Sequence, residues 1–181
     1  MVSYINKAFK IFFILINKIL YPRYDAVNSA HPTLLIFKLG IIQKVLGINR
    51  HVPWPVHWSS QINCPERINP GTRTPGLAIG CYFDGRNGIN IGNNVWIGPR
   101  VSIISMNHKS NNYEQYINDK PVQIEDNCWI ATNAIILSGV RLGPHTIVAA
   151  GSIVTKSFSE GNQIIGGNPA KVIKELSAYD V

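Results

Sequence analysis

Aliphatic residues recur every six positions over a long part of this sequence, and this period constrains the fold more than any other feature. Ile91, Ile97 and Ile103 begin the pattern. After an interruption the same spacing continues through Ile124, Ile130, Ile136, Leu142, Val148 and Val154. Small or β-branched residues stand two positions before most of these, namely Val95, Val101, Cys128, Ala134, Val140, Thr146 and Ser152. A repeat of fixed period indicates a repeat architecture.

A period of six fits neither an α-helix nor simple strand alternation. It predicts a chain that turns a corner after every six residues, so that three sides close one triangular coil. The aliphatic residue of each side should point inward and stack on its equivalents in the neighbouring coils. Glycines follow the aliphatic residue at Gly80, Gly92, Gly98 and Gly143. We expect them at corners, where a positive φ is easily adopted. Because one coil buries little by itself, stacking supplies the stability.

Size and composition allow one ordinary domain with a short appendage. The chain has 181 residues, of which 45% are hydrophobic and 15% charged. This composition excludes a disordered chain and a long solvated helix. None of the three cysteines lies within four residues of another, which excludes a disulfide framework and a CxxC metal site. A reduced, cytoplasmic setting is expected.

The positive charge is concentrated in the first third of the chain. Residues 1–60 hold Lys7, Lys10, Lys18, Arg23, Lys38, Lys44 and Arg50 against Asp25, a balance of 7 − 1 = +6. The charge belongs either to a solvated face or to a surface that attracts a lipid, a nucleotide or an anionic glycan carrier. No nucleic-acid-binding motif accompanies it, so no nucleic-acid partner is expected.

The basic segment contains two apolar stretches with helical spacing. The first consists of Ile5, Phe9, Phe12, Ile16 and Ile19 and should end at Pro22. The second covers residues 34–46, and residues 51–60 form an extended linker. The longest apolar run of the first stretch, residues 11–16, is too short to span a membrane. Both helices either flank the core or lie on a membrane surface. Peripheral contact with the inner membrane face through residues 1–50 therefore stays open.

Four short motifs accompany the repeats. They are PWPVHWSS at 53–60, NCWI at 127–130, AAGSIVTKSF at 149–158 and the closing GGNPAK at 166–171. With these motifs the chain resembles the hexapeptide-repeat acyltransferases, especially those that O-acetylate sugars and polysaccharides. The resemblance implies an all-β fold with a single left-handed parallel β-helix and an N-terminal helical extension. The extension would cover residues 1–52, the β-helix domain 53–176 and a tail 177–181. It also implies a homotrimer with each active site between two subunits.

The period breaks after His108, because residues 109–117 do not fit the repeat. A polar loop inserted into a rigid solenoid indicates a functional loop. In the resembled family a histidine at this point is the general base, and Asn107 stands beside it. Asp84 is expected either to orient the acceptor hydroxyl or the imidazole, or to be a simple corner residue.

The resemblance implies that acetyl-CoA is the acyl donor. A backbone N–H in the pair Ala131–Thr132 would stabilise the oxyanion. Trp129 should point outward, where it packs either on the pantetheine arm or between subunits.

Further candidates for the donor site lie in the C-terminal coils. The small residues Ala149, Ala150 and Gly151 leave room for the pantetheine arm. Lys156 and Lys171 would contact the CoA phosphates or stay solvated.

Other chemistries find less support. His145 and His108 could form two ligands of a metal site, but the sequence offers no third ligand near them. No metal site is therefore expected. Cys128 occupies an inward slot and is interpreted as core. Cys64 and Cys81 lack a nearby histidine in the sequence, which argues against a nucleophilic role.

The function expected from the sequence is acetyl transfer from acetyl-CoA to a sugar hydroxyl in surface polysaccharide or glycan biosynthesis, with His108 as general base. One alternative is N-acetylation of an amino-sugar nucleotide. Another is a non-catalytic scaffold that docks to a membrane or a protein partner.

Overall fold

The computed structural model describes residues 2–22 and 31–180, with side chains from Lys10 onward. The chain divides into two compact units, residues 1–58 and 59–181. Residues 53–58, which the sequence assigned to the β-helix domain, fall in the first unit. Gln43 explains this boundary. Its Nε2 donates to the carbonyls of Val52 (2.8 Å) and Trp54 (3.0 Å), and its Oε1 accepts from the Val56 N–H (3.2 Å).

The first unit is built from two helices, α1 (Val2–Leu20) and α2 (Thr33–Gly40), the latter continued by a π-helical turn (Ile41–Val45). The rings of Phe13 and Phe37 pack with centroids 4.9 Å apart. Asn17 Nδ2 donates to the carbonyl of Thr33 at 2.9 Å. Tyr21 donates its hydroxyl to Gln43 Oε1 at 2.7 Å. These contacts pack the end of α1 against α2.

The buried face of α1 differs from the predicted stripe. Asn17 and Tyr21 are fully buried, whereas Phe12 and Ile19 are 54% and 78% exposed. The contacts with α2 use residues 13, 17 and 21, which lie on a neighbouring face of the helix. The side chains of Ile5 and Phe9 lie outside the described part. Within residues 2–22 and 31–180, no helix is long and apolar enough to cross a membrane.

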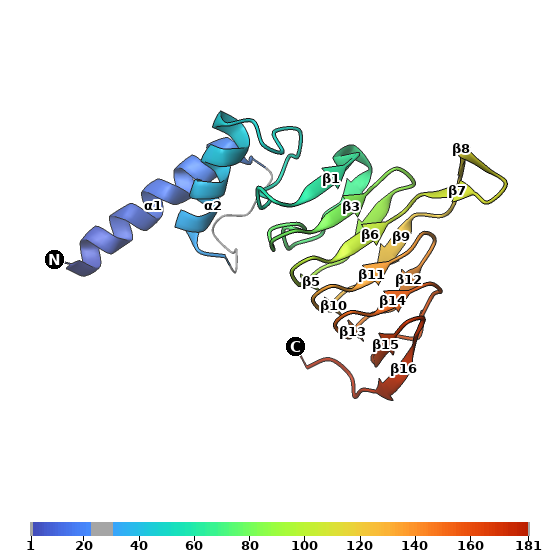
Figure 1. Cartoon of the computed structure of the whole chain (residues 1–181). Helices are drawn as coiled ribbons and strands as arrows, with labels where there is room; N and C mark the ends of the chain where they lie inside the picture. Colours follow the sequence, from blue (N-terminus) through green and yellow to red (C-terminus); the bar gives the residue numbers. More distant parts are fainter. Residues whose placement is uncertain (1, 23–30, 181) are drawn as a thin grey trace. The chain divides into compact units, whose positions relative to one another are not determined.

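The second unit is a parallel β-helix with three sheet faces (Figure 1). Face A contains β1 (Gln61–Asn63), β3 (Tyr82–Asp84), β6 (Ser102–Ile104), β11 (Ile135–Ile136) and β14 (Ile153–Val154). Face B contains β2 (Ile68–Asn69), β4 (Ile89–Ile91), β9 (Val122–Ile124) and β12 (Arg141–Leu142). Face C contains β5 (Trp96–Ile97), β10 (Trp129–Ile130), β13 (Thr146–Val148), β15 (Gln163–Gly167) and the antiparallel β16 (Ala170–Glu175).

The predicted core is confirmed at eight of the nine repeat aliphatic residues, and the exception, Ile97, is half-buried. Face A stacks Ile62, Phe83, Ile103, Ile136 and Val154 in register, each at most 1% exposed. The seven small or β-branched residues that stand two positions before the repeat aliphatic residues are also buried.

The explanation for the repeat glycines needs a correction. Among them, only Gly80 has a positive φ. A Cβ on Gly92 would lie 2.8 Å from the Asp126 nitrogen, and one on Gly143 would lie 2.3 Å from the Ser159 carbonyl oxygen. Gly92 and Gly143 are therefore glycine because adjacent coils approach closely there. The positive-φ corners instead carry Asn94, Asn127, His145 and Asn162, among others.

The predicted loop is a β-hairpin. β7 (Asn107–Lys109) pairs antiparallel with β8 (Asn112–Ile117) and leaves the solenoid between β6 of face A and β9 of face B (Figure 1). The C-terminal tail runs back over the coils. There the Tyr179 hydroxyl accepts a bond from Asn94 Nδ2 at 3.0 Å, and its ring contacts that of His145.

Candidate active site

His108 lies on β7 with an exposed side chain. Its Nδ1 makes a short hydrogen bond with the backbone carbonyl of Tyr113. A carbonyl oxygen only accepts, so Nδ1 must carry the proton in this contact. In the neutral ring Nε2 is then an unprotonated acceptor, which is the form a general base requires.

A stack of side chains connects His108 to the coil beneath the hairpin. The ring of Tyr116 lies 4.8 Å from that of His108, and the Arg86 guanidinium lies 5.0 Å from the Tyr116 centroid. Arg86 Nε and Nη2 donate to both carboxylate oxygens of Asp84 at 2.7–3.1 Å. This hydrogen bonding raises the pKa of Arg86, and Asp84 is 1% exposed. The structure thus brings Asp84 and His108 into one cluster, linked by two residues that the sequence analysis missed.

Two asparagines fix the base of the hairpin. Asn107 Nδ2 donates to Ser138 Oγ at 2.7 Å, which ties β7 to the following coil. Asn87 Nδ2 donates to the carbonyls of Ser105 and Ile117, both at 2.9 Å. Ser105 precedes the hairpin and Ile117 ends it, so one amide holds both of its ends.

The predicted oxyanion donor lies at the corner that follows face C. The Ala131 N–H already donates to the Val148 carbonyl at 2.9 Å. The Thr132 N–H has no hydrogen-bond partner among the described residues, and its hydroxyl donates to the Pro99 carbonyl at 3.0 Å. Of the predicted pair, only Thr132 therefore has an available N–H. Trp129, on β10, points outward with 52% exposure, as predicted.

The other predicted donor residues lie on the next coils. Ala149, Ala150 and Gly151 form the corner above Ala131 and Thr132, where the Gly151 N–H donates to the Thr132 carbonyl at 2.9 Å. Lys156 is exposed beside Phe158, and Lys171 is exposed on β16. Ala149 to Gly151 precede β14 and lie with Lys171, beside the end of β15, on the side of face A that carries Thr132, whereas Lys156 follows β14 on the opposite side.

The base and the predicted donor edge lie on opposite sides of face A. Thr132 precedes β11, whereas Ser138, the partner of Asn107, follows it. Extended residues 134–137 between them cover roughly 10 Å. One chain therefore does not bring His108 and Thr132 together.

The fold matches proteins of known type. The model of the bacterial transferase hexapeptide (six repeats) matches residues 121–156. The galactoside O-acetyltransferase of Escherichia coli K12 is 35% identical over 161 residues, which cover 84% of this chain and 75% of that protein. The chain belongs to the hexapeptide-repeat acetyltransferase family. Other curated relatives are matched over a little under half of their length, from 44% to 47%.

Solved structures of the family agree with this assignment. A maltose O-acetyltransferase from Clostridium difficile 630 superposes with a TM-score of 0.58 at 29% identity, covering 66% of this chain and 64% of that one. A galactoside acetyltransferase in complex with coenzyme A has the same TM-score at 23% identity, covering 93% and 82%. At that identity the second match supports the fold, the left-handed parallel β-helix predicted from the sequence.

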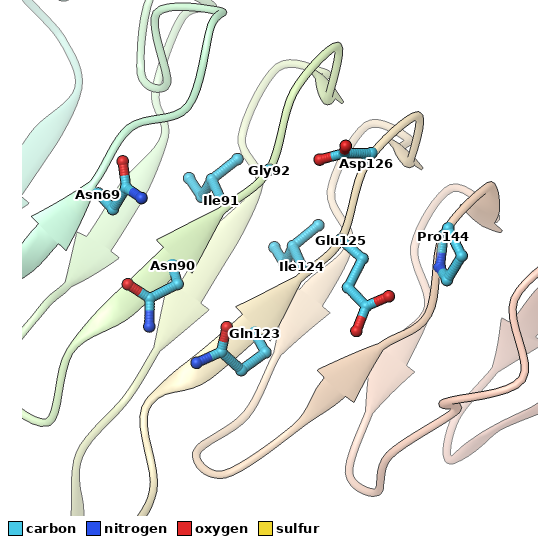
Figure 2. A pocket seen from close by; sticks show the side chains of 9 residues that line it. All are labelled: Asn69, Asn90, Ile91, Gly92, Gln123, Ile124, Glu125, Asp126 and Pro144. Atoms are coloured by element: carbon cyan, nitrogen blue, oxygen red, sulfur yellow. The ribbon is translucent and has the colours of Figure 1, made fainter.

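A polar groove on face B lies apart from the two edges that carry His108 and Thr132. Its volume is about 410 Å³, and Figure 2 shows its lining on face B and the corner after it. Asn69, Asn90 and Gln123 are in register on adjacent strands, with Glu125 and Asp126 beside them. It contains none of the predicted site residues.

The side chains considered for other chemistry have structural roles. Burial raises the pKa of the Cys128 thiol to about 12 and also raises that of Cys81. His145 is a positive-φ corner residue whose Nδ1 contacts Asn162 Oδ1 at 3.0 Å. In the described part of the chain, no three His, Cys, Asp or Glu side chains are grouped to hold a metal.

Proposed function

We propose that this protein transfers the acetyl group of acetyl-CoA to a hydroxyl of a sugar, with His108 as the general base. The observation that carries the proposal is the bond of His108 Nδ1 to the Tyr113 carbonyl, which leaves Nε2 free on an exposed ring. The relatives named for galactoside and maltose O-acetylation support a sugar acceptor. The coenzyme A complex of a neighbour with the same fold supports the donor.

The reaction needs one proton carrier. Nε2 takes the hydroxyl proton while the acceptor oxygen attacks the thioester carbon. When the tetrahedral intermediate collapses, the C–S bond breaks and the imidazolium returns the proton to the departing thiolate. The products are the acetyl ester and CoA, and the base is regenerated. The Tyr113 carbonyl keeps the ring in the required tautomer throughout.

The Thr132 N–H is proposed as the oxyanion donor. It is the unbonded N–H of the predicted pair, and it lies at the edge where Ala149 to Gly151 leave space beside the backbone. A fixed backbone donor needs no reorganisation as charge develops on the oxygen, which is why such groups contribute strongly to acyl transfer.

A second copy of the chain is proposed to complete the site. His108 stands at one edge of face A and Thr132 at the other, so the two meet only if His108 of one subunit faces Thr132 of its neighbour. A closed ring of three copies satisfies this relation at every interface. This arrangement supports the homotrimer expected from the sequence. The exposed tryptophans Trp96 and Trp129, in register on face C, give such a contact an apolar surface.

Two exposed tyrosines beside the base support a sugar acceptor. Tyr113 and Tyr116 are 76% and 50% exposed on the same hairpin as His108. Aromatic rings with one polar end suit a ligand that has both apolar C–H faces and hydroxyls. We propose a glycan acceptor of the kind used in surface polysaccharide synthesis.

The test is CoA thiol release from acetyl-CoA with a panel of acceptors. The panel contains galactosides, maltose, amino-sugar nucleotides and a lipid-linked oligosaccharide. We expect release with hydroxyl acceptors and an ester product by mass spectrometry. An amide product formed only with amino sugars would establish N-acetylation instead. Absence of release with every acceptor would favour the non-catalytic scaffold and contradict the proposal.

The first unit is proposed to contact an anionic membrane surface. Ile11, Phe12, Leu15 and Ile19 are 50–78% exposed on one side of α1, and Lys18 is exposed beside them. Apolar burial combined with about 1 kcal/mol per lysine near anionic lipid is the usual basis of such binding.

Vesicle sedimentation tests the membrane contact. We expect the full chain to pellet with phosphatidylglycerol-containing vesicles and to remain in solution with phosphatidylcholine alone. The double change Leu15→Glu and Ile19→Glu should abolish pelleting, whereas Val172→Glu, at an exposed apolar position of β16, should not. A wild-type chain that stays in the supernatant would contradict the proposal.

A further inference from the structure

We propose that the corner formed by residues 84–87 positions the catalytic base, so that Asp84, Arg86 and Asn87 act through His108 and not on the substrate. This inference rests on the proposed function and adds the part of the coil that holds the base in place. Of the roles that the sequence left open for Asp84, it favours orienting the imidazole over orienting the acceptor hydroxyl.

The hairpin that carries His108 needs external support. Every residue of β7 and β8 is exposed, and the two strands form a sheet of their own. An isolated two-stranded hairpin is marginally stable in water. A general base must hold its geometry closely, because a displacement of about 1 Å can cost roughly a hundredfold in rate. The anchoring contacts on the coil therefore bear directly on catalysis.

Asn87 closes the hairpin at its base. Its amide donates to the carbonyl of Ser105 before β7 and to that of Ile117 at the end of β8. The backbone N–H of Asn87 also donates to Ser105 Oγ at 2.9 Å. These three bonds join the corner to both strands at their origin.

Arg86 supports the imidazole of His108 indirectly, through Tyr116. Its guanidinium lies against Tyr116, and the Tyr116 ring lies against His108. With Tyr116 on one side and the Tyr113 carbonyl at Nδ1, the imidazole is held both in its plane and in its tautomer. Arg86 thus orients His108 through the ring of Tyr116.

Asp84 fixes Arg86. The carboxylate is 1% exposed, and both oxygens accept from the guanidinium of Arg86. Asp84 Oδ1 also accepts from the Arg86 N–H at 3.2 Å. An arginine held by two parallel bonds has a defined orientation, which a lysine does not reproduce. The carboxylate has little exposed surface left for an acceptor hydroxyl.

The test combines kinetics with NMR of the His108 ring. We expect Arg86→Ala to lower kcat by about tenfold to a hundredfold while the KM for acetyl-CoA and for the acceptor stays unchanged. Imidazole ¹⁵N spectra should show the Nδ1–H tautomer in the wild type and a mixture of tautomers in Arg86→Ala. Arg86→Lys should recover little, because lysine does not form the paired bonds to Asp84.

Matched variants separate positioning from general damage. Tyr116→Ala should reproduce the Arg86→Ala defect. Arg141→Ala removes an exposed arginine–carboxylate pair, with Glu125 at 2.5 Å, and should change neither readout. Asn87→Ala serves as a second variant if Arg86→Ala fails to fold, and it should give the same defect.

Two outcomes would overturn the inference. One is an Arg86→Ala variant with unchanged kcat and tautomer ratio. The other is a rise in acceptor KM alone, which would place Arg86 on the acceptor. If the wild type lacks transferase activity with all acceptors, the proposed function fails, but the imidazole spectra still decide whether the corner orients His108.

Discussion

Replacing His108 with alanine is expected to lower kcat about 10²–10⁴-fold, because no other group in the cluster has a free basic nitrogen facing solvent. Arg86 is bound to Asp84, and the amide of Asn107 donates to Ser138. Since the imidazole is exposed, its loss should leave the melting temperature nearly unchanged. The measurement is steady-state thiol release with a hydroxyl acceptor, alongside thermal unfolding.

A neighbouring residue provides the control for this substitution. Lys109 follows His108 on β7, and its ammonium bonds to Gln115 at 2.9 Å on the hairpin. Lys109→Ala should keep kcat within about twofold, as expected for the loss of an exposed polar contact. If His108→Ala also retains full activity while remaining folded, another residue is the base and the mechanism fails.

Mixing two inactive variants is expected to restore activity. One variant is His108→Ala, and the other is Ala150→Trp, which places a large side chain on the exposed corner of the donor edge. If each site takes His108 from one subunit and the donor edge from the next, random assembly of equal amounts makes about a quarter of the sites intact. Denaturing and refolding the mixture should thus give roughly a quarter of wild-type activity.

The same mixture discriminates against a site within one chain. In that case every subunit carries one of the two defects, and the refolded mixture should remain inactive. Each variant refolded alone is the baseline, and sedimentation of both must match the wild type. A mixture that stays at this baseline while forming the normal oligomer would contradict the shared site.

The β-helix could be predicted from the sequence because the same packing contact recurs in every coil and produces a repeat in the sequence. Each inward position, from Ile91 to Val154, packs on an equivalent residue of the next coil. The same residue types are therefore required at the same point of every six-residue side. Trp129 could be placed outward for the same reason. Local periodicity determines these features without knowledge of distant contacts.

The supporting cluster could not be predicted, because its members meet only after the chain has folded. Arg86 and Tyr116 lie thirty residues apart in the sequence, and neither belongs to the repeat. A signal was present in the polar corner Asp84 to Asn87, but spacing alone does not reveal that Asp84 faces Arg86. The predicted buried stripe of α1 was likewise wrong at Phe12 and Ile19. Apolar residues lie on more than one face of that helix, and packing against α2 determines which face is buried.

The way the chain re-enters the solenoid after the hairpin has an evolutionary consequence. Ile104 pairs with Asp84 just before the excursion, and Val122 pairs with Ile89 just after it, so both flanks keep their register with one preceding coil. An excursion at this corner can therefore change in length or sequence without shifting the core. A change in this hairpin can therefore alter the acceptor specificity of a related chain. The edge proposed to bind the donor stays the same.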